Sequence, residues 1–203
     1  MPILPPSTLG ILGGGQLGRM FVSAARAMGY EVIVFDPDPE SPAGSMASEH
    51  LQAEYSDTDA LDYLAKQCAV ITTEFENIPV SALDYLAQKR PVFPSAQALA
   101  ITQNRIKEKS FIQSLGLSTP AFIALESEVD LARLADMSFP AIIKTATLGY
   151  DGKGQVVCNN AEEVARAFGS MQVACVVEQM IDLEKEVSVV LSRNERGQTF
   201  CFP

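Results

Sequence analysis

The sequence predicts an α/β protein in which a parallel-sheet domain is followed by a second domain of the α+β type. In the first half, short apolar runs alternate with amphipathic stretches, which is the pattern of a parallel sheet with helices on both faces. Near residue 100 this alternation gives way to a long helical pattern and then to further strand candidates. A composition of 47% hydrophobic and 20% charged residues is typical of a globular chain.

The first half begins with a strand, helix, strand unit. An apolar run at 9–12 precedes a glycine cluster, an amphipathic stretch at 16–28 and a β-branched run at 31–35. Elements of the same kind follow: an extended piece at 51–54, a helix opened by Asp57, a strand at 69–72 and a helix after Pro79.

The second half also combines helices and strands, in the pattern of an α+β domain. One nearly continuous helical pattern covers 95–115 and ends at Gly116, so we place the domain boundary near residue 100. The strand candidates are 121–125, 141–144, 155–158, 173–178 and 186–191, with helices at 128–136 and 161–171. The sequence ends within another apolar strand, so we expect part of this domain's sheet to lie outside it.

Charge and cysteine usage exclude several classes of protein. A net charge of −10 repels phosphate backbones, so we expect no nucleic-acid partner. The chain has no apolar run long enough to span a bilayer and no basic N-terminal signal, which predicts no membrane insertion and a cytoplasmic location. The four cysteines are widely spaced, which predicts neither zinc nor disulfides. The single histidine, His50, is expected on the surface, so chemistry must depend on Lys, Arg, Glu, Asp and backbone amides.

The first motif is the glycine cluster Gly13 to Gly18, which has the G-x-G-x-x-G spacing, follows a strand and opens a helix. It is compatible with a dinucleotide, since Asp36 ends the next strand, and equally with a nucleotide monophosphate at the helix N-terminus. The alternative is that the glycines only allow tight packing of strand and helix. For Asp36 we favour the start of a rigid acidic loop over a ribose contact.

The second motif is the glutamate pair Glu74 and Glu76, just after the predicted strand at 69–72. Open parallel sheets bind ligands at this carboxyl end, and alternation would put both carboxylates on one side. They could accept hydrogen bonds from an amine or from sugar hydroxyls. The alternative is a solvated polar loop.

The third motif starts at Lys144, which ends a predicted strand and can reach a phosphate as a point charge. The loop that follows contains Gly149, Gly152 and Gly154, and its Lys153 could close over a terminal phosphate. This loop joins two strands and lacks the spacing of a Walker loop. Downstream, the link 178–181 offers backbone groups to an adenine edge, and a nearby carboxylate can bind ribose.

The segments 13–20 and 149–155, taken together and in this order, resemble the ATP-grasp superfamily and, within it, the 5-(carboxyamino)imidazole ribonucleotide synthases. The resemblance runs through all 203 residues. It implies a pre-ATP-grasp domain at 1–100 and an incomplete ATP-grasp domain at 101–203. A homodimer is common among such enzymes and is expected here.

The resemblance also implies roles for individual residues. Tyr150, Asp151 and Lys153 would act at the reaction centre. The residues expected to bind ATP are Arg105, Lys144, Gly149, Gly152, Lys153, Gly154, Gln155, Glu178, Gln179, Met180, Ile181 and Glu186. Those expected to bind aminoimidazole ribonucleotide are Gln16, Leu17, Glu74 and Tyr150, with Glu76 in reserve.

The implied reaction uses ATP to phosphorylate bicarbonate and delivers the resulting carboxyl group to the amine of aminoimidazole ribonucleotide. Mg²⁺ would be required, with its ligands beyond residue 203, so no metal ligand is assigned and the 203-residue chain alone is expected to lack turnover. The alternatives are another ATP-grasp ligase such as formate-dependent glycinamide ribonucleotide transformylase, a biotin carboxylase-like enzyme, an NAD-dependent dehydrogenase and a non-catalytic nucleotide-binding module.

Overall fold

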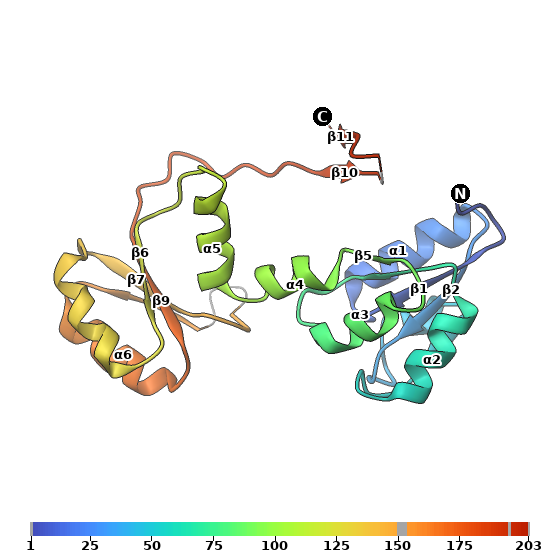
Figure 1. The fold of residues 1–203 in the computed structure, drawn as a ribbon, viewed down its shortest axis with the longest axis horizontal. Coiled ribbons are helices and arrows are strands. Elements are labelled where there is room, and N and C mark those ends of the chain that lie inside the picture. Colours follow the sequence, from blue (N-terminus) through green and yellow to red (C-terminus); the bar gives the residue numbers. More distant parts are fainter. Residues whose placement is uncertain (1, 150–153, 195, 203) are drawn as a thin grey trace.

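The computed structural model describes residues 2–149, 154–194 and 196–202. The five-stranded and the four-stranded sheet lie at opposite ends of the molecule, with the short helices α4 Ala96–Thr102 and α5 Arg105–Ser114 between them (Figure 1). The first sheet contains β1 Thr8–Leu12, β2 Glu31–Phe35, β3 Glu49–Leu51, β4 Val70–Thr73 and β5 Val92–Phe93. Its strand order is β3-β2-β1-β4-β5 and every pairing is parallel, which confirms the predicted parallel sheet.

The third strand lies earlier than the sequence predicted. The extended piece was expected at 51–54, whereas β3 pairs with β2 from Glu49 opposite Ile33 to Leu51 opposite Phe35. Because β2 ends at Phe35, the chain after Leu51 has no partner strand there and turns away.

Helices cover both faces of this sheet, as predicted. They are α1 Gln16–Ala27, α2 Thr58–Gln67 and α3 Val80–Ala87, with a short 3-10 turn, η1, at Gly44–Met46. Neighbouring residues of β1 point to opposite faces: Ile11 packs in the core beneath α1, while Leu12 packs in the core beneath α2 and α3. The side chain of Asp57 caps α2 by accepting hydrogen bonds from the amides of Asp59 and Ala60, both at 3.0 Å.

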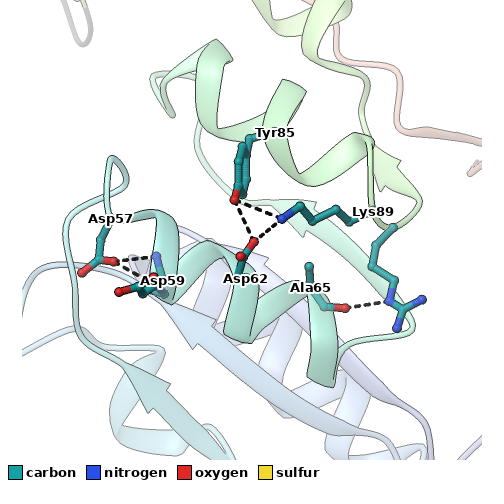
Figure 2. Close-up of polar contacts among 8 residues, drawn as sticks. Asp57, Asp59, Asp62, Ala65, Tyr85 and Lys89 are labelled. Carbon is teal, nitrogen blue, oxygen red and sulfur yellow. Dashed lines mark hydrogen bonds and ion pairs between the residues drawn. The ribbon is translucent and has the colours of Figure 1, made fainter.

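Polar contacts join α2 and α3 at the surface (Figure 2). The Tyr85 hydroxyl donates to Asp62 at 2.9 Å, Lys89 pairs with the same carboxylate, and Arg90 Nε donates to the Ala65 carbonyl at 2.6 Å. The hydrogen bonds from Lys89 and Tyr85 hold the pKa of Asp62 below its ordinary value. Asp62 and Lys89 are exposed, so their ion pair orients the two helices more than it stabilises them.

The continuous helix predicted at 95–115 is wrong, because the chain forms two helices, α4 Ala96–Thr102 and α5 Arg105–Ser114. Asn104 has an extended backbone, and its side chain accepts hydrogen bonds from the amides of Ile106 and Lys107 at 3.0 and 3.1 Å. The Arg105 amide donates to the Ala146 carbonyl at 2.8 Å. Asn104 therefore ends one helical path and caps the next.

The second sheet is antiparallel, with strand order β6-β9-β7-β8. Its strands are β6 Phe122–Leu125, β7 Ala141–Thr145, β8 Gln155–Cys158 and β9 Cys175–Gln179. The helix α6 Ala161–Met171 packs on one face, together with η2 Glu128–Asp136, which is a 3-10 helix. The strands and helices predicted between residues 121 and 179 are thus confirmed, apart from shifts at their ends.

The strand predicted at 186–191 is wrong. Within the described residues, the backbone from 182 to 189 joins no sheet, and the first strand after β9 is β10 Leu191–Arg193. It pairs only with β11 Thr199–Cys201, in a hairpin that stands apart from both sheets (Figure 1). An apolar run becomes a strand only where a neighbour pairs with it, and the described backbone at 186–189 pairs with none.

No helix in the described part of the chain has the length and apolar character needed to cross a membrane.

Candidate functional site

The amides of the glycine cluster are bound by carboxylates of the chain itself. Gly14 N–H donates to Asp36 Oδ2 at 2.7 Å. Gly15 and Gly18 N–H donate to the two oxygens of Glu74 at 2.8 and 3.0 Å. These groups lie at the positive end of α1, where a phosphate would bind in the nucleotide interpretations. The contacts therefore favour the packing interpretation of this cluster.

The Asp36 carboxylate likewise accepts hydrogen bonds from groups of the chain itself. Besides Gly14, it accepts hydrogen bonds from the Tyr55 hydroxyl at 3.1 Å and from the Asp38 amide at 2.8 Å. Burial, and then the neighbouring Asp36 carboxylate, raise the pKa of Tyr55 and keep its hydroxyl a donor. The structure thus supports the acidic loop that we favoured for Asp36. His50 is half-buried, not on the open surface, and its Nε2 lies 3.1 Å from the Asp36 carbonyl oxygen.

Glu74 and Glu76 differ in their surroundings. The strand β4 ends at Thr73, so strand alternation does not extend to either residue, and the argument that placed both carboxylates on one side fails. Glu74 is held on the α1 N-terminus, next to the exposed side chains of Gln16 and Leu17. Glu76 is exposed, and its Oε1 accepts a hydrogen bond from Asn77 at 3.1 Å.

The most concentrated charge in the second sheet is an ionic cluster on β7, β9 and α5, here called the lysine cluster: Lys109, Lys144 and Glu178. Glu178 Oε2 lies 3.1 Å from Lys144 Nζ and 3.3 Å from Lys109 Nζ. The Glu178 side chain is 9% exposed, against 14% for Lys109 and 23% for Lys144. Two cations share one carboxylate, so the cluster carries one surplus positive charge. Such a surplus suits an anionic ligand.

The glycine loop after β7 is anchored near both ends. Arg105 Nη2 donates to the Gly149 carbonyl at 2.7 Å, and the Thr145 amide donates to the Gly154 carbonyl at 2.9 Å. Gly154 has φ of +72°, and Gln155 continues into β8 opposite Lys144. Arg105 and Lys144 therefore lie at the base of the same loop. Tyr150, Asp151, Gly152 and Lys153 lie outside the described residues.

A polar cavity of about 190 Å³ lies where the loop after β4, the α4–α5 turn and the loop after β7 meet. Of the predicted site residues, it is lined by Glu76, Arg105 and Gly149. Gln103, which also lines it, donates to the carbonyls of Glu76 and Ile78, both at 2.6 Å. This turn connects the segment that carries Glu74 and Glu76 to the glycine loop.

Two backbone amides of the link 178–181, which was predicted to hold adenine, already donate hydrogen bonds within the protein. Gln179 N–H donates to the Ala121 carbonyl at 2.9 Å and Met180 N–H to the Pro140 carbonyl at 3.2 Å. Ile181 follows with a side chain 48% exposed. Glu186 is exposed and has no hydrogen bond or ion pair with any residue that the structure describes, so it is not brought to the lysine cluster.

Lys109 and Gln103 are the residues that the sequence predictions missed. Lys109 lies four residues after Arg105, so the two share one face of α5, and this spacing could have identified it. No sequence signal pointed to Gln103, because its partners are carbonyl groups distant in the chain.

Metal-binding side chains do not gather in the described ranges: no group of three or more His, Cys, Asp or Glu residues there could hold an ion.

Two family models match consecutive parts of the chain: the ribonucleotide synthetase pre-ATP-grasp domain at residues 7–103 and the ATP-grasp domain at 110–203. Among curated proteins, the N5-carboxyaminoimidazole ribonucleotide synthase of Staphylococcus aureus (strain COL) is 39% identical over 199 residues, covering 97% of this chain and 53% of the relative. The Pseudomonas aeruginosa protein of the same name is 40% identical over 197 residues, covering 96% and 54%.

The solved structures agree with these relatives. The N5-carboxyaminoimidazole synthetase of S. aureus complexed with ADP matches with a TM-score of 0.93 and 38% identity, covering 99% of this chain and 54% of that one. The chain thus spans about half the length of the curated relatives it matches. It belongs to the N5-carboxyaminoimidazole ribonucleotide synthase family of the ATP-grasp superfamily, of which it represents the N-terminal portion.

Proposed function

We propose that the protein carrying this chain uses ATP and bicarbonate to carboxylate the exocyclic amine of 5-aminoimidazole ribonucleotide in purine biosynthesis. The observation that carries the proposal is the lysine cluster, whose surplus positive charge lies at the base of the glycine loop. The name shared by the relatives supplies the acceptor, and the ADP complex of the S. aureus relative supports nucleotide binding.

The proposed reaction has two stages. A bicarbonate oxygen attacks the γ-phosphorus of ATP, the bond to the bridging oxygen breaks, and ADP leaves with that electron pair. Carboxyphosphate then breaks down to carbon dioxide and phosphate. The amine nitrogen bonds to the carbon of carbon dioxide and passes one proton to the released phosphate, which yields a carbamate. Because carboxyphosphate is readily lost to water, the site must be closed during the reaction.

The residues of this chain would bind, orient and neutralise charge. Lys144 and Arg105 would contact the phosphates, and the loop from Gly149 to Gln155, with Lys153, would cover the γ-phosphate. Tyr150 and Asp151 would act beside it. The link 178–181 would hold adenine, and Glu186 would reach ribose only if its segment moves to the sheet.

The ribonucleotide would lie against the first domain. Gln16 and Leu17 are exposed beside Glu74, while Glu76 lines the polar cavity. We propose these four residues and Tyr150 as its contacts. The described residues do not fit a magnesium site, so no step is assigned to the metal, although ATP is proposed to bind as its magnesium complex.

The test is phosphate release from Mg-ATP and bicarbonate by the full-length protein, with and without aminoimidazole ribonucleotide. We expect release to depend on the ribonucleotide and to be lost in Lys144→Ala, while that variant keeps the thermal midpoint of the wild type. Release that is stimulated by glycinamide ribonucleotide and formate would instead assign the chain to the transformylase alternative. Equal release with and without any acceptor would overturn the proposed substrate.

Three further parts of the proposal concern domain organisation, assembly and location. A domain boundary near residue 100, a homodimer and a cytoplasmic location are proposed from the pattern and the family. Sedimentation of the full-length protein tests the dimer, and a sedimenting monomer would contradict it.

A further inference from the structure

The lysine cluster contains one more cation than its carboxylate needs. Lys144 and Lys109 contact the same oxygen of Glu178, but they approach it from different elements, β7 and α5. Lys109 is the more buried of the two, and its Nζ lies 5.7 Å from the ring centroid of Phe122. Lys109 is therefore the inner partner of Glu178, and Lys144 is the outer one.

Because Glu178 is buried, the presence of a second lysine decides whether its carboxylate can lose Lys144 and still be paired. A carboxylate that is 9% exposed is strongly destabilised when it loses its counter-ion, because neither water nor another charge replaces the lost contact. If Lys144 were its only partner, moving the Lys144 ammonium to a phosphate would leave Glu178 unpaired. With Lys109 in place, one complete ion pair persists when Lys144 departs.

We propose that Lys109 is the resident counter-ion of Glu178 and that it releases Lys144 to bind the phosphates of the nucleotide. Lys109 is thus a positioning residue, which acts on the ligand through Glu178 and Lys144. This inference rests on the proposed function, because it requires a nucleotide whose phosphates reach Lys144.

The experiment compares Lys109→Met with Lys107→Met in the full-length protein. Lys107 is the same residue type on the same helix, but its side chain is exposed. Binding of ADP and of adenosine is measured by calorimetry. In Lys109→Met, ADP affinity is expected to fall about tenfold or more, as for charge pairs that lose one desolvated partner, while adenosine affinity stays constant. Lys107→Met is expected to match the wild type for both ligands.

A double variant separates this role from a general loss of structure. Glu178→Gln removes the buried carboxylate charge, so Lys144 can move to the phosphates without a second lysine staying as counter-ion. Adding Lys109→Met in that background should therefore leave ADP affinity unchanged. That double variant leaves no unpaired charge on Glu178, and its remaining cation, Lys144, is the more exposed of the two lysines, so it stays testable even if Lys109→Met alone does not fold. Lys109→Arg should retain the ADP affinity of the wild type.

Each contrary result has a defined meaning. Equal losses for ADP and adenosine, or a loss that persists in the Glu178→Gln background, would overturn the role of Lys109. Wild-type protein that binds ADP, with unchanged affinity in Lys109→Met, would also overturn it. Absence of ADP binding by the wild type would overturn the proposed function itself.

Discussion

The glycine cluster beside the first sheet and the lysine cluster beside the second both pair carboxylates with positively polarised groups. They differ in whether the carboxylates neutralise all of the positive charge. At the first, Glu74 and Asp36 bind the amides of Gly14, Gly15 and Gly18, so the positive end of α1 is already neutralised. At the second, Glu178 is shared by two lysines, and positive charge is left over.

This difference teaches which glycine-rich segment is available to an anion. In the sequence, the loop after Lys144 lacks the spacing of a Walker loop, and only Gly13 to Gly18 has a recognised nucleotide-binding spacing. In the structure, its donors serve internal packing, while the surplus charge lies beside the other glycine loop. Free donors and unbalanced charge indicate an anion site better than glycine spacing alone.

The largest expected effect tests whether the glycine cluster is a packing device. A Cβ on Gly14 would lie 1.9 Å from Ser41 Oγ, and Ser41 is buried and donates to the Gly14 carbonyl at 2.9 Å. Gly14→Ala is therefore expected to lower the free energy of unfolding by about 3 kcal/mol, as in overpacked cores. Urea denaturation measures this change.

Gly169→Ala is the matched control for that substitution. A Cβ on Gly169, within α6, meets no atom within 4 Å, so alanine should raise the free energy of unfolding by about 1 kcal/mol through helix propensity. A Gly14→Ala protein as stable as the wild type would show that the cluster is not tightly packed.

The second prediction separates the two glutamates. Glu74→Ala leaves the amides of Gly15 and Gly18 without their partner, and is expected to lower the free energy of unfolding by about 2 kcal/mol. Glu76→Ala removes an exposed side chain and should change it by less than about 0.5 kcal/mol. Thermal or urea denaturation of both variants checks the difference, and equal effects would contradict the capping role of Glu74.

The smallest effect concerns Cys68, in the core between the first sheet and α2, at alkaline pH. Burial, followed by the nearby Glu49, raises the pKa of the Cys68 thiol to about 12. A raised folded-state pKa favours the neutral thiol, so its contribution is complete below the unfolded pKa of about 9 and is lost as pH rises towards 12.

The free energy of unfolding should thus fall more steeply above pH 9 in the wild type than in Cys68→Ala, by about 1 kcal/mol per pH unit. Urea denaturation between pH 7 and about 10.5 measures the two slopes. Cys201→Ala, which removes an exposed thiol, should keep the wild-type slope. Parallel curves for all three proteins would show that Cys68 does not titrate on unfolding.

Local sequence determined most of the elements. Apolar runs identified β1, β2 and β4 of the first sheet, and Asp57 marked the start of α2, because burial periodicity and capping act within a few residues. The predictions failed where contacts with distant segments decide the structure. One is the break at Asn104, where the next amide, that of Arg105, donates to Ala146, and the other is the run 186–189, which finds no partner strand among the described residues.

The sequence by itself thus determined the fold class, the positions of the motifs and, through resemblance, the family. Only the tertiary structure decided how those motifs are used. It placed Glu74 on the helix terminus 56 residues away in the chain and brought Lys109 to the carboxylate it shares with Lys144. Hydrogen bonds and ion pairs depend on distances of about 3 Å, and between residues remote in sequence only the packed fold sets such distances.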